Sequence, residues 1–131
     1  MTLMQWLSPS RIVRAHCDLP CGVYDPAQAR IEAESVKACQ EKHNGSDDPV
    51  FQARAVAIKE ERADMVKHHL WVLWTDYFKP EHLEAHPELH TLFWEATKSA
   101  GACKKTNDPA EGQKLLDLVG QIDKVFWDTK K

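Results

Sequence analysis

Three Asp-Pro pairs constrain the fold of this chain more than any other feature of its sequence. They are Asp25-Pro26, Asp48-Pro49 and Asp108-Pro109, and a helical pattern of apolar residues follows each of them. Aspartate is a favoured N-cap, and proline is favoured at the first helical position because its missing N–H would have no helical partner there. The three pairs therefore predict the starts of three helices.

The spacing of apolar residues predicts four helices, and no run of alternating β-branched residues competes with them. The first two are expected over residues 26–43 and 49–78, the third from about Pro87, and the fourth over residues 109–129. Four helices with short connections favour an all-α fold, an antiparallel up-down four-helix bundle. The length of 131 residues suits one such domain.

Apolar residues at steps of three and four predict the inner face of each helix. Two charged residues, Glu32 and Arg62, interrupt these faces, and the antiparallel register of the first two helices places them close together, as an ion pair or as support for a nearby site. The expected inner residues are Ala29, Glu32, Val36 and Cys39; Phe51, Ala55, Ile58, Arg62, Met65, His69 and Val72; Leu89, Leu92, Phe93, Ala96 and Ala100; and Leu115, Leu118, Val119, Ile122, Val125 and Phe126.

Charge and hydropathy exclude two classes of partner. The formal net charge is −3 and no block of Lys and Arg stands out, which argues against binding to nucleic acid. No apolar run approaches the roughly 18 to 20 residues that span a bilayer, so no membrane role is expected. Pro9 interrupts the short apolar run at the N-terminus, so secretion is not indicated and we expect a cytoplasmic protein.

Residues 16–24, HCDLPCGVY, concentrate one imidazole, two thiols and a phenol ahead of the first helix. Three residues separate Cys17 from Cys21, and one of them is Pro20, so this loop can fold back and aim both sulfurs at one point. Such a pair alone is a weak signal for a metal, and zinc would need two further ligands in a tetrahedral arrangement. We call this loop the hook.

Cleavage between Ala15 and His16 would change the chemistry of the hook. The freed α-amine and the Cys17 amide nitrogen would form a chelate in one plane with the two thiolates, and the His16 imidazole would approach axially. Planar nitrogen and sulfur ligation favours nickel or copper over zinc. Such a cut would make residues 1–15 a removable leader and residues 16–131 the working domain, and the residues alone leave open whether it occurs.

The stretch HCDLPCGVYDP resembles the nickel hook of the nickel-containing superoxide dismutase family, whose mature chain begins at that histidine. The similarity extends over residues 16–131 and includes KHHLWVLWTDYFKPEH, GQKLLDL and QIDKVFW. It implies a nickel ion bound by His16, Cys17 and Cys21 that cycles between Ni(II) and Ni(III) while superoxide becomes dioxygen and hydrogen peroxide. It also implies a homohexamer and a peptidase that removes the leader.

The resemblance assigns further residues to the site. Tyr24 and Tyr77 match tyrosines that line the access of the small anion and order its waters. Glu32 and Arg62 match residues that orient the histidine ring, and Asp18 helps to shape the hook. Arg62 and Tyr77 are separated by roughly 22 Å along one helix, so they serve one site only if a neighbouring subunit supplies one of them.

Two function classes from outside the family are open on the sequence alone. A thiol-based redox or structural-metal protein would use Cys17 and Cys21 without cleavage, whereas a helical interaction module would not use the hook. Tyr24 would then only anchor the hook to the bundle. Intact mass separates these classes from the nickel enzyme, because only the enzyme needs to lose its leader.

The remaining cysteines, histidines and tryptophans have simpler interpretations. Cys39 and Cys103 are expected to be small core residues, with a disulfide between them as the alternative. Pro87 interrupts the helical spacing of His82, His86 and His90, so a zinc site formed by these three histidines is not expected. A bundle this small cannot bury all its tryptophans, so some should lie in subunit contacts. The tryptophans in question are Trp71, Trp74, Trp94 and Trp127.

Overall fold

The computed structural model describes residues 22–131, and the hook residues His16, Cys17, Asp18 and Cys21 lie outside this part of the chain. Within it the regular structure is helical, which confirms the predicted all-α class. The elements are α2 (Ala27–Asn44), α3 (Pro49–Val72), the π-helical turn η1 (Leu73–Tyr77), α4 (Pro80–Ala85), α5 (Leu89–Lys104) and α6 (Pro109–Asp128).

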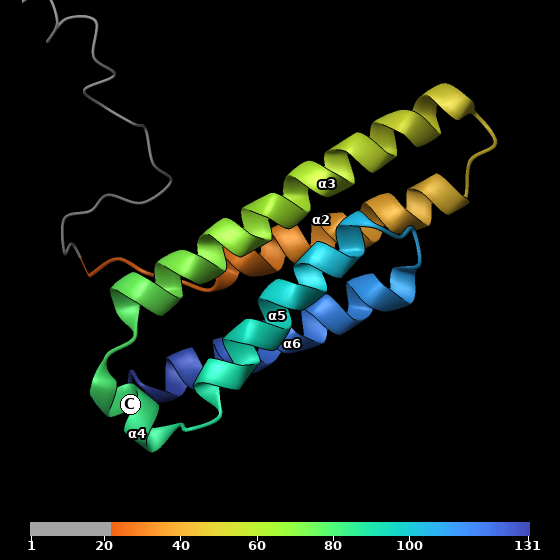
Figure 1. Cartoon of the computed structure of the whole chain (residues 1–131). Coiled ribbons are helices and arrows are strands. Elements are labelled where there is room, and N and C mark those ends of the chain that lie inside the picture. The colour runs from red at the N-terminus through yellow and green to blue at the C-terminus, as the bar shows by residue number, and fades with distance from the viewer. Residues whose placement is uncertain (1–21) are drawn as a thin grey trace, which may run out of the picture.

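The four long helices form the expected antiparallel up-down bundle (Figure 1). Helix α2 packs against α3 and α6, and α5 packs against the same two helices, so each long helix has two close neighbours. The α2–α3 and α5–α6 turns lie at one end of the bundle, and η1, α4 and the C-terminus lie at the other. None of the helices in residues 22–131 has the length and apolarity to cross a bilayer.

Aspartate side chains cap α3 and α6 where the Asp-Pro pairs predict, and Asp25 lies one residue before the cap position of α2. Asp48 and Asp108 each accept a hydrogen bond at 3.0 Å from the amide N–H two residues further on. Asp25 accepts the same kind of bond at 2.8 Å, although α2 begins one residue later than expected, because Pro26 occupies the cap position. Such a cap typically contributes about 1 kcal/mol to stability.

The predicted C-terminal end of the second helix is wrong. A single helix to Phe78 was expected, but the α-helix ends at Val72 and a π-helical turn follows. The Phe78 amide donates to the Leu73 carbonyl at 3.0 Å, the five-residue spacing of a π-turn. Phe78 itself has extended backbone dihedral angles and is buried.

The connection to the third long helix is also more structured than predicted. Residues 80–85 form α4 where only a turn was expected, because proline is tolerated at the first helical position. The Lys79 amide donates to Nδ1 of His82 at 3.1 Å, which satisfies one free donor at the start of α4. Helix α5 then begins at Leu89, two residues after the expected start at Pro87.

The inner faces of α5 and α6 are as predicted, whereas those of α2 and α3 are predicted only in part. Ala29, Val36, Ala55 and His69 are buried as expected, but the buried stripe of each helix is otherwise rotated by about one residue. All eleven residues expected inside α5 and α6 are buried. On α3, Phe51 and Ile58 were expected inside but are 42% and 37% exposed. The expected inner residues Glu32, Cys39, Arg62, Met65 and Val72 are only partly buried. The residues buried instead are Ala33 and Gln40 on α2, and Lys59, Ala63, Val66 and Leu70 on α3.

This rotation places a lysine in the core at the α5–α6 turn. Lys59 is 2% exposed, and its Nζ donates to the Thr106 carbonyl at 2.7 Å and to Oδ1 of Asn107 at 2.9 Å. Desolvation by burial lowers the pKa of Lys59. The Gln40 side-chain amide donates to the same Thr106 carbonyl at 3.2 Å. These bonds fasten the α5–α6 turn to α2 and α3.

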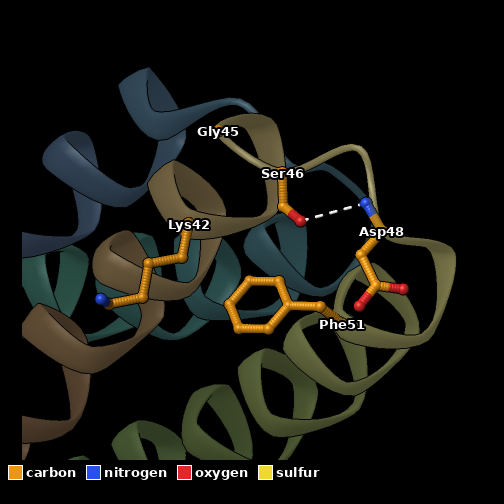
Figure 2. A pocket seen from close by; sticks show the side chains of 5 residues that line it. All are labelled: Lys42, Gly45, Ser46, Asp48 and Phe51. Atoms are coloured by element: carbon orange, nitrogen blue, oxygen red, sulfur yellow. Dashed lines mark hydrogen bonds between the residues drawn. The ribbon is translucent and has the colours of Figure 1, made fainter.

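A pocket of about 370 Å³ opens at the turn between α2 and α3 (Figure 2). The Ser46 hydroxyl in its wall accepts a hydrogen bond from the Asp48 amide at 3.2 Å. Because α2 has 18 residues, roughly 27 Å of helix separates this pocket from the segment that leads into α2 from the hook. The pocket is lined by Lys42, Gly45, Ser46, Asp48 and Phe51.

Gly112 allows α6 to approach α2 closely, and an alanine there should destabilise the bundle. A Cβ at this buried position would overlap Oε1 of Gln40 and lie 2.9 Å from Cα of Lys37. We expect Gly112→Ala to lower the free energy of unfolding by about 1–3 kcal/mol, because overpacking outweighs the better helix propensity of alanine. Denaturant unfolding of the purified chain measures the change.

Gly120 is the matched control, because it lies on the same helix, is exposed, and leaves a Cβ with nothing within 4 Å. Gly120→Ala should raise the free energy of unfolding by up to ~1 kcal/mol, the difference in helix propensity. If both substitutions stabilised the protein equally, the close α2–α6 contact would be wrong.

Candidate metal centre

The chain enters α2 beside the end of α3, so the residues next to the hook meet η1. Gly22, which directly follows Cys21, has a φ of 74°, the left-handed conformation that favours glycine. Tyr24, the last residue of the HCDLPCGVY stretch, then packs against Tyr77, with the ring centroids 5.6 Å apart. The structure therefore brings the two predicted site tyrosines together at the end of the bundle where α2 begins.

Tyr77 is the last residue of η1 and is held on several sides. Its ring packs against Phe126 of α6 at 4.4 Å between centroids and stacks on His82 of α4 at 5.7 Å. Its hydroxyl lies 2.5 Å from Oγ1 of Thr129. The sequence indicated neither His82 nor Thr129 as a neighbour. Thr129 lies far from Tyr77 in the chain, and His82 lies on α4, a helix that was not predicted.

The predicted contact between Glu32 and Arg62 is confirmed. Nη1 of Arg62 lies 3.2 Å and 3.3 Å from the two carboxylate oxygens of Glu32. The Glu32 side chain is 15% exposed and that of Arg62 is 38% exposed, so the pair lies at the edge of the bundle. A pair with this exposure adds roughly 1 kcal/mol at most to stability, and the carboxylate keeps lone pairs for a further donor.

The two predicted groups of site residues occupy different levels of the bundle. Ten residues of α3 separate Arg62 from Val72, which corresponds to roughly 15 Å, and η1 with Tyr77 follows. The Glu32–Arg62 pair and the Tyr24–Tyr77 pair therefore do not surround one point within one bundle. This agrees with the separation that the sequence predicts for Arg62 and Tyr77.

The described part of the chain contains no group of three His, Cys, Asp or Glu side chains that could hold a metal ion. Nδ1 of His86 lies 3.5 Å from a carboxylate oxygen of Glu88, and the His90 ring meets Trp74 edge-on at 5.5 Å. Both of these histidines therefore have neighbours of their own in residues 22–131.

Cys39 and Cys103 are free thiols, so the alternative of a disulfide between them is not adopted. Cys103 is fully buried, as expected. Desolvation, and then the nearby Glu111 carboxylate, raise the pKa of Cys103 to about 11, so its thiol is neutral at pH 7. Cys39 is only partly buried and lines an apolar pocket of about 190 Å³ between α2 and α3.

The donors of the hook fit nickel by their chemistry. His16, Cys17 and Cys21 offer one imidazole and two thiolates, and cleavage before His16 would add an amine and an amide nitrogen. Thiolate and imidazole ligands suit late transition metals, and planar nitrogen and sulfur donors suit nickel(II) or copper(II). Hard cations such as magnesium and calcium prefer oxygen ligands instead.

Comparison with known proteins gives close relatives over almost the whole chain. The family model for nickel-containing superoxide dismutase matches residues 11–130. The nickel superoxide dismutase of Streptomyces seoulensis is 64% identical over 129 residues, and that of Streptomyces coelicolor is 63% identical over the same length, with 98% of each chain covered in both cases.

The solved structures agree with these relatives. A native structure of nickel superoxide dismutase superposes with a TM-score of 0.87 at 66% identity, covering 88% of this chain and 100% of the other. A structure with nickel ligation corresponding to the oxidised state gives a TM-score of 0.86 at 68% identity, covering 88% and 98%. The chain therefore belongs to the nickel-containing superoxide dismutase family.

Proposed function

We propose that this chain, after removal of residues 1–15, converts superoxide to dioxygen and hydrogen peroxide with a nickel ion bound by His16, Cys17 and Cys21. As a member of its family it is a superoxide dismutase with a nickel cofactor. The observation that carries the assignment of ligands is the HCDLPCGVYDP stretch, and its Tyr24 packs against Tyr77. When bound, nickel supplies one-electron oxidation and reduction between Ni(II) and Ni(III), and anionic donors favour the higher state.

The coverage of the relatives supports removal of a leader. This chain covers 98% of the curated sequences, whereas 88% of it matches the whole of the native solved chain. That difference is expected if the curated sequences contain a leader and the solved protein has lost it. We propose a peptidase that cuts between Ala15 and His16. The short, proline-interrupted apolar run of the leader favours processing in the cytoplasm rather than export.

The residues around the hook would control access and protons. Tyr24 and Tyr77 form the aromatic wall next to the hook, where they would admit a small anion and order its waters. Asp18 would shape the hook. Leader removal takes away Arg11 and Arg14 and shifts the formal net charge from −3 to −5, so attraction of superoxide must be local, from Lys79 and Arg62.

The two levels of site residues support sharing of the site between subunits. The Glu32–Arg62 pair lies roughly 15 Å or more along the bundle from Tyr77, so we propose that it orients the His16 ring of a neighbouring subunit in a homohexamer. Exposed tryptophans support such an assembly, since Trp71, Trp94 and Trp127 are 52%, 59% and 47% exposed. The first two border an apolar groove of about 260 Å³ between α3 and α5.

A single chain could also complete its own site. Glu32 lies roughly 9 Å along α2 from Pro26, which is short enough for the hook to fold back onto its own helix. The sharing of sites therefore needs an experiment that distinguishes one subunit from two.

Mixed assemblies provide this experiment. Glu32→Ala and His16→Ala chains are each expected to be inactive, because one lacks the group that orients the histidine and the other lacks the histidine. When the two are co-assembled with nickel, sharing predicts that superoxide decay recovers in part, since some sites then receive an intact hook and an intact Glu32–Arg62 pair.

The processed, unmodified chain is the reference for these measurements. No recovery on mixing would show that each chain builds its own site. A reference protein that carries nickel but leaves the decay of superoxide unchanged would contradict the proposed function itself.

A further inference from the structure

The last residues of the chain hold the hydroxyl of Tyr77. Thr129 caps the C-terminal end of α6, and its Oγ1 lies 2.5 Å from the Tyr77 hydroxyl. Nζ of Lys130 lies 5.0 Å from the centroid of the Tyr77 ring and 5.4 Å from that of Phe126, within the range of a cation–π contact. Residues 129 and 130 thus fix Tyr77 from the side of α6.

A second contact of Thr129 settles the direction of this hydrogen bond. Oγ1 of Thr129 also lies 2.5 Å from the Phe126 carbonyl oxygen, which can only accept. The threonine hydroxyl has one proton, and it donates that proton to the carbonyl. In the contact with Tyr77 it must therefore accept, so the Tyr77 hydroxyl is the donor.

We propose that Thr129 is a positioning residue for the dismutase site, because it holds the phenol proton of Tyr77 toward α6. The phenol oxygen then keeps its lone pairs for an incoming water, which it orders as an acceptor. The proton of Tyr77 is already engaged and is not the proton that the product peroxide takes up. The functional part of this inference rests on the proposed function, whereas the hydrogen bond does not.

Two substitutions separate the hydroxyl from the shape of the side chain. Thr129→Val keeps the β-branched shape and removes the acceptor, and Thr129→Ser keeps the hydroxyl. The chain has two tyrosines, so a Tyr24→Phe background leaves Tyr77 as the sole tyrosine in the Raman spectrum. The tyrosine Fermi doublet reports whether a phenol donates a hydrogen bond.

The expected result has a spectroscopic and a kinetic part. In the Tyr24→Phe background, the doublet should show that the Tyr77 phenol is a strong hydrogen-bond donor when Thr129 is intact. The Thr129→Ser variant should give a similar doublet, and the Thr129→Val variant should lose the signature of a donating phenol. In the nickel-loaded chain with Tyr24 intact, Thr129→Val should lower kcat about two- to tenfold, the range that corresponds to one hydrogen bond, and Thr129→Ser should recover most of it.

Thr97→Val is the matched control, since the Thr97 hydroxyl also donates to a carbonyl of its own helix, that of Phe93 at 2.7 Å, without touching Tyr77. It should leave the doublet unchanged. An unchanged doublet in Thr129→Val would overturn the inference, as would a changed doublet with unchanged kcat. An inactive, nickel-loaded unmodified chain would contradict the proposed function instead, and the doublet would still decide the role of Thr129 in holding the phenol.

Discussion

The uncut chain is expected to show no dismutase activity, and cleavage between Ala15 and His16 is expected to produce it in full. With the leader attached, the nitrogen of His16 is an amide that is bonded to Ala15. An amide nitrogen in that position cannot act as the amine donor, so one of the donors proposed to hold nickel would be missing. Superoxide decay, measured before and after cleavage on samples checked by intact mass, tests this expectation.

A chain with one extra residue before His16 is the matched control. It lacks almost the whole leader but still carries an amide at His16, so it should be as inactive as the full chain. If that protein were active, the leader would act by blocking the site rather than by capping the amine. Full activity in protein shown by mass to be uncut would contradict the proposed role of the amine altogether.

Replacement of either hook thiol should abolish nickel binding without unfolding the bundle. Cys17→Ser or Cys21→Ser exchanges a soft anionic donor for a neutral hydroxyl, which is a poor ligand for nickel. Both residues precede the helices whose faces form the described core, so the helical circular dichroism and the unfolding midpoint should stay close to those of the unmodified apo chain. Metal analysis after nickel loading and desalting measures the loss.

Cys39→Ser is the control for a general effect of removing a thiol. Cys39 is partly buried in the C-terminal half of α2, and its replacement should leave the nickel content unchanged. Unchanged nickel content in Cys17→Ser or in Cys21→Ser would end the assignment of that sulfur as a ligand. Loss of nickel in Cys39→Ser would point to a site outside the hook.

The sequence predicted the helices of this fold well where local chemistry determines them. Asp48 and Asp108 mark the starts of α3 and α6 because a capping carboxylate and an N-terminal proline act within a few residues. The faces of α5 and α6 were predicted because each has one clear apolar stripe, from Leu89 and from Leu115 onward.

The errors arise where tertiary contacts decide the outcome. Helix α3 has two candidate stripes, and the one that contains Lys59 is buried because the α5–α6 turn supplies oxygen acceptors for its Nζ. The π-turn that positions Tyr77 has no local signal in the sequence. The role of Thr129 also has no local signal in the sequence, because its contact with Tyr77 depends on the packing of α6 beside η1.

The candidate site was predictable only where helix register or the family resemblance indicates a contact. The ion pair of Glu32 and Arg62 followed from the antiparallel register of two helices joined by a short turn, and the structure confirms it. The resemblance assigned Tyr24 and Tyr77 to one access path, and the structure brings their rings together. The assignment of His16, Cys17 and Cys21 as ligands rests on the hook sequence and on the family, and it stays a prediction.

Nickel content of the processed chain tests the central claim most directly. Protein cleaved before His16, loaded with an equimolar mixture of nickel and zinc salts under reducing conditions and then desalted, is analysed for both metals together with its superoxide decay. The account predicts about one nickel per chain, with activity proportional to nickel. A chain that retains zinc in place of nickel, or that binds nickel equally well with its leader attached, would contradict it.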